Sequence, residues 1–315
     1  KAVEAMQQAV RQVHLYPDGN AFYLKNKLAD NLDIEAGNLI FGNGSNEIIE
    51  FLSHALLGPG DEIVVSQYCF AIYPIVAQMM GAKVITVPAK NYGHDLPAMV
   101  AAITPRTRAL FVANPNNPTG TLSPRADVVT LMNEIPDEVL LVMDEAYIEF
   151  LDSPVDLLPL IRRGDKPNLL LMRTFSKIYG LAGLRIGYGI GDPEFIAALE
   201  KIRQPFNANA VAQAGALAAL EDADHLAATR SNNEAGLSYL NHELRMMGVN
   251  YVPSAANFVL LEVGDGGKVF ADLQAKGVIT RPMAGYQLPD WVRVSVGTPE
   301  ENTRFIHTLK DVLGK

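Results

Sequence analysis

Cysteine, clustered basic residues and long apolar runs are scarce or missing in this 315-residue chain. A single cysteine, Cys69, excludes an internal disulfide framework and is compatible with a reducing cytoplasm, where we expect the protein. No Cys/His cluster has the spacing of a zinc site, so we expect no metal. No apolar run approaches the roughly 20 residues that span a bilayer, and no basic block offsets the net charge of −9. We therefore expect neither a membrane nor a nucleic acid as a partner.

What is present is an alternation of short apolar segments and helical stretches between about residues 17 and 205. Segments 63–65, 83–87 and 109–112 have the length and composition of buried strands. Such alternation predicts a doubly wound α/β domain. The stretch 187–191 is rich in glycine, but it lacks the third glycine of a dinucleotide-binding loop and instead predicts close strand packing.

The pattern changes near Pro205. An Ala-rich stretch over 208–219 predicts a helix that leaves the large domain, and the remainder predicts a smaller α+β domain with a strand at 258–263. The domains we expect are an N-terminal segment over 1–16, a large domain over 17–207, and an interdomain helix with the small domain over 208–315.

One lysine lies among small, apolar and hydroxyl residues directly after an expected strand. Lys177 follows the apolar run 169–172, so we expect it at an interior edge of the sheet and not as a solvated surface charge. A partly desolvated amine loses its proton more readily, and a neutral amine can form a Schiff base with an aldehyde cofactor such as pyridoxal phosphate. Thr174, Ser176 and Arg185 would then hold the phosphate. On this stretch alone, the cofactor interpretation has no advantage over its alternatives, which are a chance Ser-Lys pair and a Ser-Lys hydrolase.

Two more expected strands end in polar side chains. Asn117 lies in a turn after the strand at 109–112, and Asp144 and Tyr147 follow the apolar run 139–143. Taken singly, Asn117 is a turn residue and Asp144 a helix cap. Because open parallel sheets bind ligands at the carboxyl ends of their strands, three such ends together favour one site.

This set of side chains suits a pyridine cofactor. A carboxylate such as Asp144 keeps the ring nitrogen protonated, so that the ring draws electrons from the substrate. Asn117 and Tyr147 can donate hydrogen bonds to the phenolic oxygen of the ring. Once substrate displaces Lys177 from the cofactor, the free amine can act as general base and then as general acid. Transamination needs these steps.

In order and spacing, five motifs resemble those of fold-type I pyridoxal-phosphate aminotransferases (class I/II) of the aspartate aminotransferase superfamily, and within it the histidinol-phosphate aminotransferases. They cover nearly the whole chain and are Gly42–Glu47, Asn114–Gly120, Asp144–Tyr147, Thr174–Gly187 and Trp291–Thr298. The resemblance implies a large doubly wound mixed-sheet domain with a smaller α+β C-terminal domain. It also implies pyridoxal 5′-phosphate as cofactor and a homodimer with shared active sites.

The resemblance assigns cofactor contacts to single residues. Backbone amides of Ser45 and Asn46, at a helix start, help bind the cofactor phosphate, which agrees with the dipole of a helix amino terminus. The ring of Phe70 stacks on the pyridine, with Tyr68 as the alternative. Tyr16 reaches the cofactor phosphate of the neighbouring subunit.

Two arginines are implied as substrate contacts. Arg293 binds the substrate carboxylate, for which a planar guanidinium is better suited than a lysine. Arg281 helps hold the phosphate of histidinol phosphate, although a solvated surface arginine is the alternative. The chain begins at Lys1, inside a helix expected over 2–13, so we also expect an earlier Asn- and Pro-rich segment, which covers the active site in relatives.

The reaction implied is transamination between histidinol phosphate and 2-oxoglutarate in histidine biosynthesis, which gives imidazole acetol phosphate and glutamate. An aromatic-amino-acid aminotransferase and a threonine-phosphate decarboxylase share the scaffold and stay open, because small differences in the pocket decide the substrate. A third hypothesis, the non-catalytic sensor half of a transcription regulator, predicts an attached basic DNA-binding domain, of which these residues show no sign.

Overall fold

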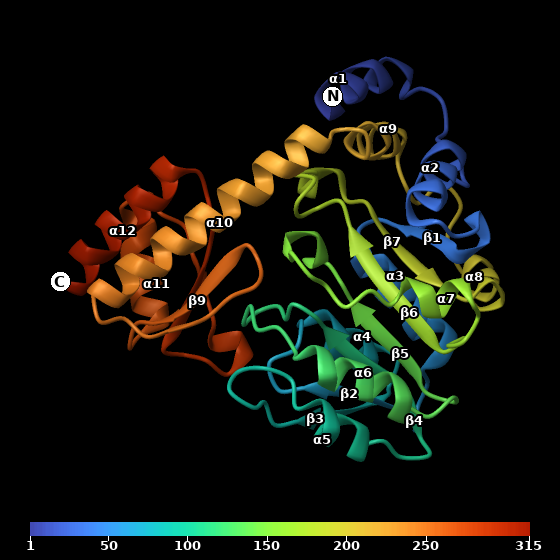
Figure 1. The fold of residues 1–315 in the computed structure, drawn as a ribbon, viewed down its shortest axis with the longest axis horizontal. Coiled ribbons are helices and arrows are strands. Elements are labelled where there is room, and N and C mark those ends of the chain that lie inside the picture. The colour runs from blue at the N-terminus through green and yellow to red at the C-terminus, as the bar shows by residue number, and fades with distance from the viewer.

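The computed structural model describes residues 1–315 and contains two β-sheets (Figure 1). The larger sheet has seven strands in the order β1-β7-β6-β5-β4-β2-β3. Their bounds are β1 Leu39–Gly42, β2 Glu62–Ser66, β3 Lys83–Val87, β4 Thr107–Ala113, β5 Leu140–Asp144, β6 Leu169–Thr174 and β7 Gly187–Gly191. Strand β7 is antiparallel to both of its neighbours, β1 and β6, whereas the other neighbouring strands are parallel, so the sheet is mixed, as expected.

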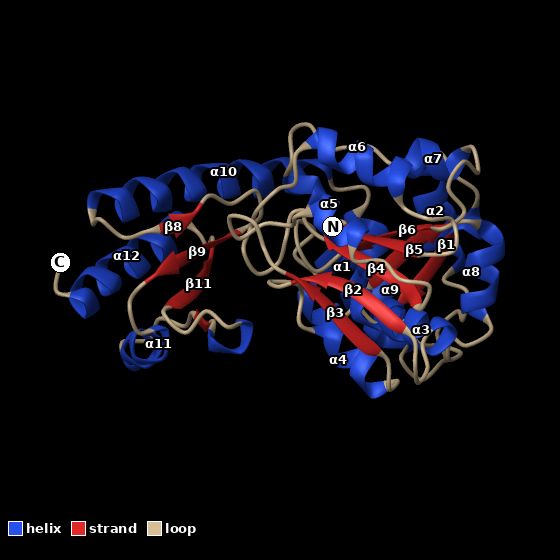
Figure 2. Cartoon of the chain, turned by 90° about the horizontal axis from the view of Figure 1, so that it is seen from below, coloured by secondary structure: helices blue, strands red, loops and turns tan.

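The central strands are buried on both faces, which explains their continuous apolar sequences. In β5, Leu141 and Met143 face one hydrophobic core, whereas Leu140 and Val142 face the other. Helices cover both faces of this sheet (Figure 2). One face packs against α3 Ser45–Leu56, α4 Ile72–Met79 and α8 Pro193–Glu200, and the other against α2 Phe22–Leu32, α5 Leu96–Ala101, α6 Arg125–Glu134, α7 Leu158–Arg162 and α9 Ala210–Ala219.

The smaller sheet has the order β10-β11-β9-β8 and is antiparallel throughout. Its strands are β8 Tyr251–Val252, β9 Phe258–Glu262, β10 Arg281–Pro282 and β11 Trp291–Ser295. Its apolar core is shared with three helices, α10 Ala223–Met246, α11 Gly266–Ala275 and α12 Pro299–Leu313. The long helix α10 runs from the side of the large sheet to the outer end of the small one (Figure 1).

The N-terminal helix is shorter than expected. The helix predicted over 2–13 is α1 Ala2–Ala9, followed by a 3-10 turn at Val10–Gln12. Helix α1 lies against α9. None of the helices combines the length and the apolar character that crossing a bilayer requires.

The register of the parallel strands brings their polar carboxyl ends together. Ala113 at the end of β4 pairs with Asp144 at the end of β5, and Asp144 pairs with Met172 in β6. Thr174 ends β6 and pairs with Gly187, the first residue of β7. The segments that follow these ends therefore meet along one side of the sheet, which is formed by the carboxyl ends of its parallel strands and is called its carboxyl edge below.

Candidate active site

A cavity of ≈ 190 Å³ opens at this carboxyl edge. Apart from Tyr16, every residue predicted to contact the cofactor lines it: Ser45, Asn46, Phe70, Asn117, Asp144, Tyr147, Thr174, Ser176, Lys177 and Arg185. Tyr68, the alternative to Phe70, stacks on Tyr92 at 5.9 Å and is not part of the lining. Residues from distant parts of the chain therefore lie together at the carboxyl ends of the strands, where the sequence predicted one site.

One end of the cavity is built to receive an anion. Helix α3 begins there at Ser45, and no side chain caps it, so its first backbone N–H groups are available. Gly44, before the helix, has a φ of 77°, and a Cβ there would overlap the Arg185 guanidinium. A Cβ at Gly187 would lie 2.5 Å from Ser45 N, so this glycine lets the helix start lie directly on the sheet.

Asp144 is a buried carboxylate with two hydrogen-bond donors. Its Oδ1 accepts from the backbone N–H of Ala146 at 3.1 Å, and its Oδ2 accepts from the Tyr73 hydroxyl at 2.6 Å. Burial raises the pKa of Asp144, whereas the Tyr73 bond, the Ala146 bond and the charge of Lys177 lower it. Sequence reasoning missed Tyr73, although a tyrosine in a helix as apolar as α4 signals a hydroxyl that needs a partner.

Lys177 presents its amine to the same cavity. Its Nζ lies 5.0 Å from the centroid of the Tyr147 ring. Burial lowers the pKa of Lys177, and the positive charge of Arg293 lowers it further, while Asp144 opposes both. The neutral amine, which is the nucleophile and base, is therefore more accessible than in an exposed lysine.

The two predicted substrate arginines lie on neighbouring strands of the small sheet. Arg293 donates from Nη1 to Asn117 Oδ1, and its guanidinium lies 4.7 Å from the centroid of the Phe258 ring. Arg281 pairs with Arg293 in the β10–β11 register and is exposed. Neither lines the cavity, but Arg293 reaches its wall through Asn117.

Tyr16 lies outside the cavity. It is 84% exposed, and its ring lies 4.9 Å from that of Phe206, which is itself 45% exposed. Within one chain it therefore has no part in this site.

A buried ion pair behind the site was not predicted either. Arg173 and Glu145 meet at 2.8 Å, with side chains 11% and 3% exposed. Glu145 follows Asp144, and Arg173 precedes Thr174, so the pair links the ends of β5 and β6. Removal of one partner would leave a buried charge uncompensated.

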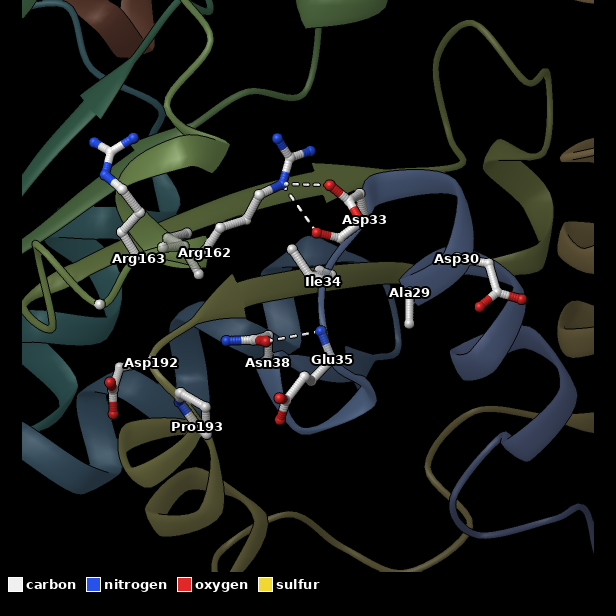
Figure 3. A pocket seen from close by; sticks show the side chains of 12 residues that line it. Ala29, Asp30, Asp33, Ile34, Glu35, Asn38, Arg162, Arg163, Asp192 and Pro193 are labelled. Carbon is white, nitrogen blue, oxygen red and sulfur yellow. Dashed lines mark hydrogen bonds and ion pairs between the residues drawn. The ribbon is translucent and has the colours of Figure 1, made fainter.

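A larger hollow of ≈ 760 Å³ lies at the opposite edge of the large sheet, near the end of β7 (Figure 3). Three of its charged side chains already have partners within the protein: Arg162 donates to the Leu32 and Asp33 carbonyls, Arg163 pairs with Asp165, and Asp192 caps α8. No three His, Cys, Asp or Glu side chains of the chain lie close enough together to hold a metal ion.

Comparison with known proteins identifies the family. The sequence profile described as "Aminotransferase class I and II" matches residues 1–309. The histidinol-phosphate aminotransferase of Akkermansia muciniphila is 46% identical over 314 residues, which cover 99% of this chain and 86% of that protein. Histidinol-phosphate aminotransferase 1 of Nitrosococcus oceani is 47% identical over 313 residues, with 99% and 85% covered.

A solved structure agrees with these sequence relatives. Histidinol-phosphate aminotransferase from Sinorhizobium meliloti, in complex with pyridoxal-5′-phosphate, superposes with a TM-score of 0.91 at 30% identity. The match covers 99% of this chain and 86% of that one. The fold with a large mixed sheet and a second, smaller sheet matches that of this structure. The chain belongs to the aminotransferase class I and II family.

Proposed function

We propose that this protein is a pyridoxal-phosphate-dependent aminotransferase that transfers an amino group from histidinol phosphate to 2-oxoglutarate. The observation that carries the proposal is the cavity itself, where the amine of Lys177, the carboxylate of Asp144 and the uncapped start of α3 face one space. These are an amine for an aldehyde, an anion for a pyridinium and donors for a phosphate. Relatives named as histidinol-phosphate aminotransferases, 46% and 47% identical over 99% of this chain, support histidinol phosphate as the amino donor.

The lining residues fit the cofactor at each end. Ser45 and Asn46 would hold the phosphate through backbone N–H groups, and Thr174, Ser176 and Arg185 through side chains. Arg185 already donates to Ser176 Oγ at 3.4 Å, so the two lie on the same side of the cavity. Phe70 would cover one face of the ring.

When bound, pyridoxal phosphate supplies an aldehyde that takes up the amino group and a ring that accepts electrons. Asp144 would hold a proton on the ring nitrogen. Asn117, whose Oδ1 is occupied by Arg293, has its amide N–H₂ left to donate to the ring oxygen, together with the Tyr147 hydroxyl. Lys177 would take the proton from the substrate α carbon and return it to the cofactor carbon.

Arg293 and Arg281 would bind the anionic ends of the substrates. The first would hold the carboxylate of glutamate, and the pair together the phosphate of histidinol phosphate. The direct test compares catalytic efficiency for histidinol phosphate, tyrosine, phenylalanine and threonine phosphate with 2-oxoglutarate as acceptor. Highest efficiency with histidinol phosphate is expected. Preference for an aromatic amino acid, or release of carbon dioxide from threonine phosphate, would instead indicate one of the two alternatives.

We propose a homodimer as the active form, located in the cytoplasm, where a buried free thiol such as Cys69 stays reduced. Exposed aromatic side chains near the N-terminus support an interface: Tyr16 at 84%, Phe22 at 60% and Tyr23 at 74%. Mixing Tyr16→Phe and Lys177→Ala proteins should produce hybrid dimers in which one of the two sites is free of both changes, so the mixture should be more active than the two proteins assayed separately. A fully active monomer in sedimentation would contradict this.

The domain boundaries at 16/17 and 207/208 remain our proposal. The second boundary is supported by the ranges of the two sheets, since β1 to β7 lie within 39–191 and β8 to β11 within 251–295. Limited proteolysis with cuts concentrated near residue 207 would support the second boundary, and early cuts within 39–191 would argue against it.

A further inference from the structure

Tyr73 contacts the site without lining the cavity. Its hydroxyl donates to Asp144 Oδ2 at 2.6 Å, and Asp144 lines the cavity whereas Tyr73 does not. We propose that Tyr73 is a positioning residue, whose hydroxyl orients the Asp144 carboxylate toward the cavity and keeps it ionised. This inference deepens the proposed function and rests on it, because an ionised Asp144 is what a pyridinium nitrogen requires.

Tyr73 is itself held firmly in place. It is fully buried, its ring stacks on Phe111 at 4.7 Å, and the edge of Phe70 lies 5.6 Å away. Tyr73 N donates to Phe70 O at 3.2 Å, so one turn of chain carries both residues. Phe70 lines the cavity, whereas Tyr73 reaches it only through Asp144. Asp144 is the one hydrogen-bond partner of the hydroxyl.

The hydroxyl matters because Asp144 has few other sources of stabilisation for its charge. Burial favours the neutral acid, and the three opposing groups are the Tyr73 hydroxyl, the Ala146 N–H and the charge of Lys177. The chemistry uses Lys177 as a neutral amine, so its charge is absent when Asp144 has to be ionised. The two hydrogen bonds then remain.

The other titratable groups around this carboxylate do not replace Tyr73. Burial raises the pKa of Tyr147, and it raises the pKa of Cys69 to about 12, so both are neutral at working pH. The neighbouring Glu145 is paired with Arg173. Burial holds the pKa of Tyr73 well above its usual value, so it stays a donor.

The sign of the effect follows from these contacts. A donor to a carboxylate stabilises the charged form, so loss of the Tyr73 hydroxyl raises the pKa of Asp144. As pH falls, Asp144 of Tyr73→Phe takes up its proton earlier than in the parent protein. The defect therefore grows toward low pH and fades at high pH, where Asp144 is ionised in both proteins. A pure packing defect would not depend on pH in this way.

The first test needs no cofactor. Carbon-13 NMR of the 315-residue chain, with the Asp144 carboxyl signal assigned by its loss in Asp144→Asn, measures the titration midpoint. For Tyr73→Phe we expect a midpoint about one to two pH units above that of the parent, as for one hydrogen bond to a charged group. Tyr188→Phe is the matched control, since that tyrosine is equally buried but lies near Arg173. An unchanged midpoint in Tyr73→Phe overturns the proposal.

The second test uses pyridoxal 5′-phosphate and measures its dissociation constant at pH 6 and pH 8.5. Tyr73→Phe should lose about tenfold more affinity at the lower pH. Phe111→Leu, which removes the stacking ring and keeps the hydroxyl, should lower thermal stability with no such pH dependence. Equal loss at both pH values in Tyr73→Phe indicates packing alone and rejects the inference. A parent protein that binds no cofactor would reject the proposed function, and the NMR midpoint would still decide the role of Tyr73.

Discussion

The large sheet has a cavity at the carboxyl ends of its parallel strands and a hollow at the opposite ends. The two differ in the availability of their polar groups, which their volumes do not show. The hollow at the edge near Asp192 is the larger, at ≈ 760 Å³ against ≈ 190 Å³ for the cavity around Lys177. In the hollow, Arg162 is already bonded to Asp33 (Figure 3), and Arg163 is paired with Asp165. In the cavity, the first N–H groups of α3 have no side-chain cap, and the amine of Lys177 is desolvated, so both are available to a ligand. Chemistry is therefore expected where polar groups are buried and still available, not where space is greatest.

The largest effect expected at the carboxyl edge comes from loss of the amine. Lys177→Ala should lower turnover by about 10⁴-fold or more, since it removes both the nucleophile and the proton carrier. The exposed Lys201, changed to alanine, is the control and should leave turnover unchanged. Borohydride reduction of the loaded enzyme followed by peptide mass mapping checks the assignment. A pyridoxyl group found on a different lysine would sink it.

The next largest effect is expected from Asp144→Asn, and the same change at Asp30 in the larger hollow allows a direct comparison of the two sites. An amide cannot stabilise a pyridinium charge, so turnover should fall about 10²-fold or more. Asp30→Asn makes the same change in the larger hollow, where Asp30 is exposed and without a hydrogen-bond partner, and should have no effect on turnover. Steady-state kinetics of the two variants side by side decide the matter. Near-normal turnover in Asp144→Asn would reject its assigned role.

Arg281→Ala should change substrate preference more than overall activity. Loss of one charge-assisted contact to a phosphate costs about 1.5 to 3 kcal/mol, so catalytic efficiency with histidinol phosphate should fall roughly 10- to 150-fold. Phenylalanine, which has no phosphate, is the internal control and should be affected far less. The measurement is kcat/KM for both donors. An equal loss for both would remove the argument for phosphate recognition.

The smallest effect is expected at the larger hollow. Arg162→Ala removes hydrogen bonds of 2.6 Å and 2.9 Å to the carbonyls of Leu32 and Asp33 at the end of α2. We expect the free energy of unfolding to fall by about 1 kcal/mol, with kcat and KM unchanged. Denaturant unfolding and steady-state kinetics test this together. A marked loss of activity would mean that the two edges are not independent.

The positions of the strand ends could be predicted because an apolar run and the polar residues after it are adjacent in the sequence. The run 139–143 became β5 Leu140–Asp144, and the run 169–172 became β6 Leu169–Thr174. The register that aligns them then follows from a parallel sheet. Helix α10 was not predicted as an element, since it is mostly polar and buries only one narrow side, through residues such as Leu240 and Leu244.

Side-chain contacts between distant segments could not be predicted from the sequence. The bond from Tyr73 to Asp144 joins residues 71 positions apart and depends on where α4 packs beneath the sheet. The Arg173–Glu145 pair depends in the same way on the neighbouring positions of β5 and β6. Neither has a local pattern, because tertiary packing and not spacing brings the partners together.

The pairing of Thr174 with Gly187 has a consequence for how this chain could be rebuilt. Everything between the two residues leaves the sheet and returns to the same point, so 175–186 is one loop that carries Ser176, Lys177 and Arg185 together. The loop is also part of the fold, because Phe175, Leu181 and Ile186 lie in the apolar core on one face of the large sheet. A rebuilt loop would therefore have to keep these three apolar anchors while the polar residues between them are exchanged.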